Sequence, residues 1–410
     1  MSAPSQDPAV VRRAQIVDLA RAVPAGVLLP LETSVLLTIA IQRYHASGTT
    51  KGLVAAAAGV GLLLSPLVTA AARRSGRPVM VFASTISLAG AAAFVLGATG
   101  PLPLFVIGSI GGIAAVNTVL PLITHTYDRN FPAHERGRRV GWGMSVRVAV
   151  SAVVGLAMGA LLKAHLGAWW TLLLAGAAAL VAAGVLFGLM PSDPLPVVEG
   201  RANRPWPHFH LLATDRRLRL TLATWMLMGF GNLMLIPMRV EYLAQPQYGI
   251  DASAAKISLL TVTIPSIVRL ASMPLFGAVF DRLSFFAARI VVNLLFALYI
   301  AAFFTGTSDA GLVAGAVVLG IASAGGDLMW TLWVTKFAPP GRVADYMGLH
   351  TFFTGVRAVT APILAFAIVE RLALTDVAWL AAALIVASAL VLLPEARAER
   401  TARSLATAEP

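Results

Sequence analysis

Hydrophobic residues fall in long runs that are separated by short polar turns along almost the whole chain. Each run is about 20 residues long, which is the length that an α-helix needs to cross the hydrocarbon core of a bilayer. The runs occupy residues 22–45, 50–72, 78–98, 102–125, 139–162, 166–189, 218–243, 255–279, 286–306, 311–335, 345–369 and 374–394. The pattern predicts an all-α polytopic membrane protein with twelve transmembrane helices.

The composition supports this interpretation and excludes several kinds of chemistry. Hydrophobic residues make up 58% of the 410 positions and charged residues 12%, whereas about a quarter of the residues in a soluble domain are charged. The absence of cysteine excludes disulfides, thiolate metal sites and cysteine nucleophiles. Neither a catalytic constellation nor a phosphate-binding loop stands out, so we expect a protein that is not an enzyme and that needs no cofactor or metal.

The net charge of +12 is explained by topology rather than by nucleic acid. Basic clusters occur at 73–77, 135–139, 215–219 and 395–403, in every second connection, and only six of the 31 Lys and Arg residues fall in the connections between them. Such a bias marks the cytoplasmic side. We therefore expect both termini in the cytoplasm, membrane lipids as neighbours and no nucleic-acid partner. Because arginine and alanine are abundant and lysine is rare, we expect the inner (cytoplasmic) membrane of a bacterium.

The longest polar stretch divides the chain into two halves. Residues 190–217 are proline-rich and basic, which is typical of a cytoplasmic linker. We expect a cytoplasmic N-terminal segment (1–21), a first six-helix bundle (22–189), the linker, a second six-helix bundle (218–394) and a cytoplasmic tail (395–410). The halves echo each other, since "RVGWGM" (139–144) parallels "RVADYM" (342–347). Parallel repeats of this kind are typical of secondary transporters.

A charged turn after the second run of each half carries a family resemblance. "TAAARRSGR" (69–77) keeps Arg74, Gly76 and Arg77, and "GAVFDRLSF" (277–285) keeps Gly277, Asp281 and Arg282, of a motif that reads Gly, three residues, Asp-Arg, one residue, Gly-Arg. With two such copies in a twelve-helix chain, the sequence resembles the major facilitator superfamily (MFS). The resemblance implies two pseudo-symmetric six-helix bundles, a gating role for these turns and a substrate site near the midplane.

The sequence departs from the family's patterns at several positions. Thr69 and Arg73 replace the Gly and Asp of the first copy, and Ser284 and Phe285 replace the Gly-Arg of the second. The fifth run, "SAVVGLAMGALL" (151–162), lacks the Gly-Pro pair of drug/proton antiporters. These departures weaken the expectation of a latch in the first half and the antiporter interpretation.

Ionisable residues within the runs are the candidate functional groups, because charges are costly in hydrocarbon unless they face protein or water. They are Glu32, Arg147, Arg269, Asp327, His350 and Arg357. All six fall in hydrophobic runs that line a central cavity according to the family resemblance. Ser258, Thr261, Pro265, Arg269 and Ser272 are spaced to share one helix face, as are His350, Thr354 and Arg357. Arg289, near the cytoplasmic end of the ninth run, is expected to snorkel to the membrane surface.

Arginine binds carboxylates and phosphates in a forked geometry. We therefore predict a small-molecule substrate that is a small organic anion, or an amphipathic one. The predicted substrate-binding residues are Arg147, Arg269, Arg357, Asn117, Asn232 and Trp330. The alternative is that the arginines are permanently paired with Glu32 and Asp327.

Proton coupling is predicted from Glu32 and Asp327, since a carboxylate in a low-dielectric cavity can gain and lose a proton as access alternates. His350 is a third candidate, although its position favours a polar residue at the membrane interface, and Trp333 is expected to be an interfacial anchor. Asp327 and Arg357 form the intramembrane pair to mutate first.

The sequence thus predicts a secondary active transporter that is monomeric, works by alternating access and is coupled to protons or another ion. A drug or lipid exporter of the same fold, or a non-transporting receptor or assembly factor, are the alternatives.

Overall fold

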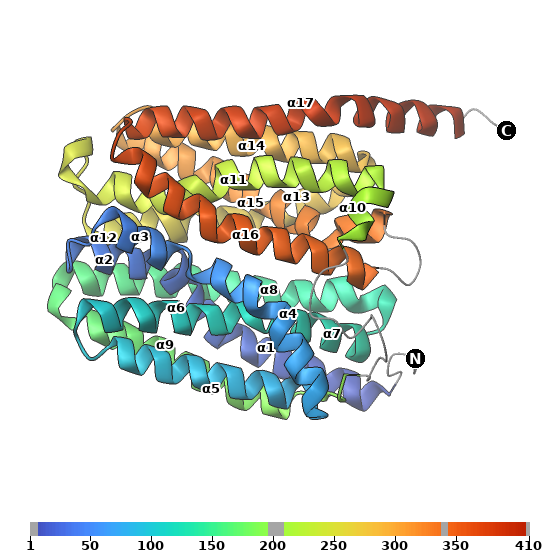
Figure 1. Cartoon of the computed structure of the whole chain (residues 1–410), viewed down its shortest axis with the longest axis horizontal. Helices are drawn as coiled ribbons and strands as arrows, with labels where there is room; N and C mark the ends of the chain where they lie inside the picture. Colours follow the sequence, from blue (N-terminus) through green and yellow to red (C-terminus); the bar gives the residue numbers. More distant parts are fainter. Residues whose placement is uncertain (1–6, 196–208, 338–342, 407–410) are drawn as a thin grey trace. The chain divides into compact units, whose positions relative to one another are not determined.

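The computed structural model describes residues 7–195, 209–337 and 343–406, except for the side chains of residues 133–134, 277–282, 328, 331–332, 334–337, 343–345 and 402–406. Helices form nearly all of the described secondary structure, with one isolated bridge between Pro78 and Pro194 (Figure 1). A helix satisfies all its backbone hydrogen bonds internally, which is what an apolar, water-free environment requires.

Eleven helices among the described residues are long and apolar enough to cross a membrane, and the bent pair α3–α4 makes a twelfth if it counts as one span. The pair consists of α3 (Gly48–Ala55) and α4 (Ala57–Ser75), which meet at an angle of 47°. The predicted all-helical, multi-span architecture is confirmed.

The chain divides into two compact units, of which the first contains Met1–Pro207 and Ala252–Thr263. Besides α3 and α4, its elements are α1 (Pro8–Pro30), η1 (Leu31–Val35), α2 (Leu36–Gln42), α5 (Val79–Gly97), α6 (Leu102–Thr118), α7 (Leu120–Asn130), α8 (Ala133–Ala164), η2 (Leu166–Ala168), α9 (Trp169–Leu189), α12 (Ala254–Ser258) and η5 (Leu259–Thr263). Both η1 and η5 are π-helical turns.

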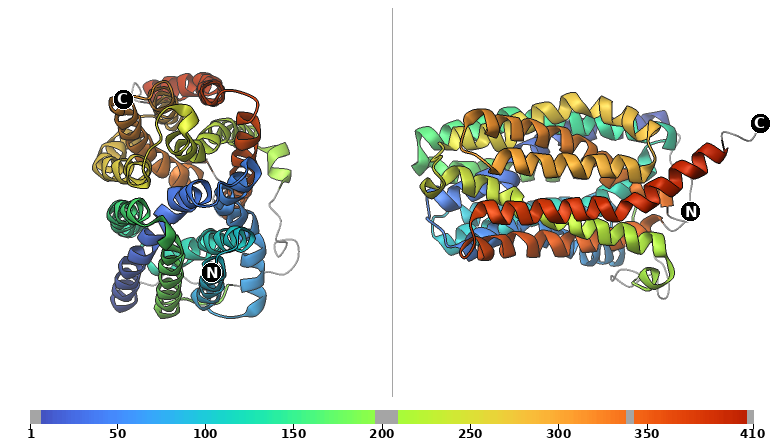
Figure 2. Two further views of the ribbon diagram at one scale, coloured as in Figure 1. Left: turned by 90° about the vertical axis from the view of Figure 1, so that its left-hand side faces the viewer. Right: turned by 90° about the horizontal axis from the view of Figure 1, so that it is seen from above.

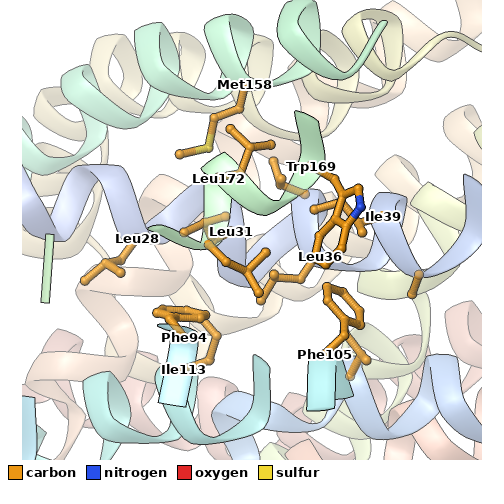
Figure 3. Packing of buried hydrophobic residues seen from close by; sticks show 14 of the residues in the cluster. Leu28, Leu31, Leu36, Ile39, Phe94, Phe105, Ile113, Met158, Trp169 and Leu172 are labelled. Carbon is orange, nitrogen blue, oxygen red and sulfur yellow. The ribbon is translucent and has the colours of Figure 1, made fainter. Parts of the chain in front are cut away.

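The core of this unit forms around its first helix. Leu28, Leu31, Leu36 and Ile39 line the path from α1 to α2 and pack against Phe94, Phe105, Ile113, Met158, Trp169 and Leu172 of the neighbouring helices (Figure 3). Tyr44 closes one end of the cluster, because its ring lies 5.0 Å from Phe105 and 5.5 Å from Trp169 between centroids. The first helix is thereby fixed by α5, α6, α8 and α9 together.

The second unit contains His208–Asp251 and Ile264–Pro410. Its elements are α10 (His210–Thr214), α11 (Arg216–Ala244), η4 (Pro246–Tyr248), α13 (Ile264–Arg282), α14 (Phe285–Phe304), α15 (Asp309–Phe337), α16 (Val343–Val369) and α17 (Leu374–Ala406). A buried polar chain links three of them: Asn293 Nδ2 of α14 donates to Ser388 Oγ of α17 at 3.1 Å, and Ser388 donates to the carbonyl of Thr224 in α11 at 2.8 Å. The views in Figure 2 show the helices of this unit end-on and from above.

The start of α11 is fixed by a capping residue. Asp215 accepts the amide of Leu218 at 2.9 Å, which satisfies one of the free donors of the first turn. The hydroxyl of Tyr346 in α16 donates to the other oxygen of Asp215 at 2.5 Å. This cap therefore joins α11 to α16.

Several helix boundaries differ from the predicted ones, most at the two ends of the chain. The first helix begins at Pro8 rather than at residue 22, because Asp7 caps Ala9 at 2.9 Å and Pro8 suits the first helical turn. The fourth span runs on to Asn130, with one irregular residue, Val119, between α6 and α7 and close to Pro121. The last helix continues past residue 394 to Ala406, where its end extends beyond the other helices of its unit (Figure 2).

Candidate functional site

Glu32, Asn117 and Arg147 lie together in the first unit. Glu32 belongs to the π turn η1, which follows Pro30, a residue with no amide hydrogen to donate. Asn117 Nδ2 of α6 donates to Glu32 Oε2 at 3.3 Å and to the carbonyl of Ile113 at 3.1 Å. Arg147 of α8 is close enough for its charge to act on that of Glu32. The structure thus brings one predicted coupling residue beside two predicted substrate-binding residues, at a π turn, a distortion that is frequent at functional sites.

Arg269 and Asp327 form an ion pair between α13 and α15 of the second unit. Their side chains are 16% and 31% exposed, so the pair is only partly buried. Of the two residues singled out for mutation, Asp327 therefore pairs with Arg269. Arg357 belongs to a different set of contacts.

Arg357 of α16 is buried against α11. It donates through Nη1 to the carbonyl of Trp225 and through Nη2 to Thr354 Oγ1 at 3.3 Å. The guanidinium has room because the facing residue of α11 is Gly229, where a Cβ atom would overlap it. Asn232, also predicted to bind substrate, is half-buried on the same helix, and its Oδ1 atom has no hydrogen-bond partner among the described residues.

His350 is enclosed by three tryptophans. Its ring centroid lies 5.5 Å from Trp225, 5.7 Å from Trp330 and 5.1 Å from Trp333, and the residue is 1% exposed. The interpretation of His350 as an interfacial residue is wrong, as is that of Trp333 as an interfacial anchor, because Trp333 is fully buried. The distance of His350 from the end of α16 was a poor guide to its burial, because the indole rings of Trp225 in α11 and of Trp330 and Trp333 in α15 cover it.

Arg289 of α14 is a residue that sequence reasoning placed incorrectly. It is 1% exposed, lies 4.1 Å from the centroid of the Trp225 ring and donates through Nη1 to the carbonyl of Thr221 at 3.3 Å. It does not snorkel. The sequence held one signal, because Arg289 and Asn293 are four residues apart and so share a helix face, and Asn293 is itself buried.

A second missed cluster lies in the first unit. Asp18 Oδ1 accepts hydrogen bonds from Arg21 Nη2 at 2.7 Å and from the Tyr127 hydroxyl at 2.6 Å. Asp18 is fully buried, and its Oδ2 faces Gly143 of α8. The cluster fixes α1 against α7 and α8. An acid and an arginine three residues apart were its only sequence signal.

The predicted gating turns are described in part. Gly76 ends α4 in the left-handed region with φ of 62°, where glycine is favoured, and Arg74 and Arg77 are exposed beside it. Gly277, Asp281 and Arg282 fall in α13, where their side chains lie outside the described residues. Within the described part of the chain no group of three His, Cys, Asp or Glu residues is arranged to hold a metal ion.

Comparisons with known proteins agree on the family. The sequence profile of the Major Facilitator Superfamily matches residues 24–308. A comparison with curated protein sequences gives no match.

Among solved structures, a D-xylose-proton symporter is similar, with a TM-score of 0.69 and 16% identity over 95% of this chain and 97% of that one. The nucleoside transporter NupG is similar with a TM-score of 0.66 and 16% identity over 94% of this chain and 98% of that one. The human organic anion transporter MFSD10 (TETRAN) is similar as well, with a TM-score of 0.67 and 15% identity over 94% of this chain and 100% of that one. At these identities the likeness shows the fold. Together with the profile match it establishes that the chain belongs to the major facilitator superfamily of membrane transporters.

Proposed function

We propose that the protein carries a small organic anion across the membrane by alternating access, in a cycle coupled to protons. The observation that carries this proposal is the partly exposed ion pair of Arg269 and Asp327. An arginine within a membrane span stays charged and offers two parallel donors to a carboxylate or phosphate. When a proton neutralises Asp327, Arg269 loses its partner and becomes available to an anionic substrate.

The first unit offers a comparable set, which supports the same proposal. Glu32 accepts a hydrogen bond from Asn117 and lies within the electrostatic reach of Arg147. Each unit therefore holds, among its predicted site residues, a carboxylate and an arginine whose charges interact. Protonation of the carboxylate and binding of an anion to the arginine would leave the net charge of the set unchanged. This balance favours moving an anion together with a proton.

We assign proton coupling to Glu32 and Asp327 ahead of His350, since three tryptophans enclose the imidazole. Arg269 and Arg147 are the primary substrate contacts in this proposal, and Asn117, Asn232 and Trp330 are its further candidate contacts. Arg357, held by Trp225 and Thr354, is the more deeply buried third arginine. The gating role of Arg74, Gly76, Arg77, Gly277, Asp281 and Arg282 stays part of the proposal.

Substrate class is tested by ligand-induced changes in melting temperature. Benzoate, succinate and a nucleoside monophosphate would be compared with the neutral compounds xylose and uridine, which probe the chemistry of the similar transporters. We expect stabilisation by at least one anion, and its loss in Arg269→Ala and Arg147→Ala but not in the exposed control Arg138→Ala. Wild-type affinity in the Arg147, Arg269 and Arg357 variants would contradict the proposal, as would a response to the neutral compounds alone.

Coupling is tested by flux of the identified anion into proteoliposomes. We expect an inward proton gradient to drive accumulation in the wild type. Asp327→Asn and Glu32→Gln should retain exchange of labelled for unlabelled substrate while losing accumulation, because exchange needs no net proton movement. Accumulation that does not depend on the proton gradient would contradict proton coupling. Binding with no flux in either direction would favour a receptor, and flux only out of the cytoplasmic side would favour an exporter.

The charge bias of the connections supports a further part of the proposal. We place the protein as a monomer in the cytoplasmic membrane of a bacterium with both termini in the cytoplasm.

A further inference from the structure

Buried polar atoms without hydrogen-bond partners are concentrated around Trp225 in the second unit. They are Thr221 Oγ1, Trp225 Nε1, Arg289 Nε and Nη2, His350 Nε2 and Arg357 Nε. Thr221 and Trp225 belong to α11, and the others come from α14 and α16. Most buried polar atoms in proteins have a partner, and each exception needs an explanation. Six on five neighbouring residues indicate that a group outside the chain satisfies some of them.

The contacts among these residues show that they form one cluster. The Trp225 ring lies 4.1 Å from the guanidinium carbon of Arg289 and 5.9 Å from that of Arg357, measured to the ring centroid. The ring of His350 lies 5.5 Å from that of Trp225. The backbone carbonyl of Thr221 accepts a hydrogen bond from Arg289 Nη1 at 3.3 Å. The donors of both guanidinium groups therefore lie near the same indole.

The cluster also carries an unbalanced charge. Arg289 is 1% exposed and Arg357 is 5% exposed, yet among the described residues neither forms an ion pair with a carboxylate. Their protein hydrogen-bond acceptors, the carbonyls of Thr221 and Trp225 and the hydroxyl of Thr354, are all neutral. Arginine does not release its proton readily, and two like charges in a buried site strongly oppose folding unless an opposite charge is near.

We propose that this cluster binds a small inorganic anion of the chloride type as a resident ion of the second unit. Nε and Nη2 of Arg289 and Nε of Arg357 would donate to the ion, with the indole N–H of Trp225 as a neutral donor. A halide suits the site because it can accept hydrogen bonds from several N–H groups in any direction. A water molecule could accept the same hydrogen bonds, but it would leave the positive charge of the two arginines unbalanced. The ion would hold α11, α14 and α16 together. Arg289 lies outside the residues proposed for substrate transport, whereas Arg357 is shared with them, so the test below rests on Arg289.

The test is direct binding of radioactive chloride to the full-length protein in detergent, exchanged into sodium gluconate. We expect saturable binding of about one ion per chain, and bromide should compete while gluconate should not. Arg289→Gln should lose binding, and Arg138→Gln, which removes an exposed arginine of the first unit, should keep it. Melting temperature should rise with chloride at constant ionic strength in the wild type and in Arg138→Gln only.

Three results would overturn the proposal. The first is the absence of saturable chloride binding in the folded wild type, which is decisive even where Arg289→Gln does not fold. The second is full binding in a folded Arg289→Gln variant. The third is chloride binding that appears only after Asp281→Asn or Asp345→Asn, since it would show that a carboxylate outside the described side chains balances the two arginines in the wild type.

Discussion

Replacing Gly229 with alanine tests whether the position of Arg357 depends on a missing side chain. A Cβ atom at this position would overlap Nη1, Cζ and Nε of the Arg357 guanidinium. The guanidinium would have to move, and its hydrogen bond to the carbonyl of Trp225 would break. The backbone of a helix resists such movement, so we expect the arginine rather than α11 to shift.

The magnitude follows from three contributions. Overpacking a buried site costs about 1–3 kcal/mol, and loss of a hydrogen bond to a charged group costs about 1.5–3 kcal/mol. Alanine regains about 1 kcal/mol over glycine through its helix propensity. The expected net loss in the free energy of unfolding is therefore about 1.5–5 kcal/mol.

Gly348 of α16 provides the matched control, because it is exposed and no atom lies within 4 Å of the Cβ that alanine would add. Gly348→Ala should raise stability by up to about 1 kcal/mol. Both variants would be unfolded by denaturant in mixed micelles, with tryptophan fluorescence as the signal. Equal stability of the two variants would refute the packing described for Gly229 and Arg357.

Three further predictions concern a cap, a turn and the topology. Asp215→Ala should destabilise the protein by about 1 kcal/mol at pH 7. Burial opposes ionisation of Asp215, but hydrogen bonds from Tyr346 and from the amides of Leu218 and Arg217 prevail and lower its pKa below the ordinary 3.8. Its stabilising contribution is therefore present above about pH 4 and lost as the pH falls through the lowered pKa, so a stability difference from wild type that grows below pH 4 would contradict the assignment. Gly76→Ala should cost about 1–2 kcal/mol, because its φ of 62° disfavours a side chain. Gly137→Ala, in open space within α8, should instead raise stability by up to about 1 kcal/mol. Because the chain has no cysteine, a single introduced cysteine reports on which side of the membrane it lies. Arg138→Cys should react with a membrane-impermeant thiol reagent only after the membrane is opened, whereas Thr49→Cys should react in intact cells. The reverse result would show that the proposed orientation is inverted.

The sequence predicted most of the fold, because length and hydropathy are sufficient to identify membrane spans. It did not predict that α1 begins at Pro8, since its first turns carry Arg12 and Arg13 and are not apolar. Helix capping by Asp7 was the signal there, and it is independent of hydropathy.

The candidate site was harder to predict, because partners depend on tertiary packing. Sequence alone listed Arg269, Asp327 and Arg357 as buried charges, but it could not determine which arginine meets Asp327. It also judged Arg289 and His350 by their distance from a helix end. The structure shows instead that their burial depends on Trp225 and other rings of adjacent helices.

The π turns η1 (Leu31–Val35) and η5 (Leu259–Thr263) have a consequence for helical phase. In an α-helix each residue advances about 100° around the axis, so a turn that accommodates one extra residue rotates everything after it by about that angle. The side chains before and after η5 therefore do not follow one straight stripe, and the spacing from Ser258 to Ser272 in the sequence overstates how well those residues align. Deleting one residue within either turn would restore regular winding while leaving the later side chains of that helix facing as they do now.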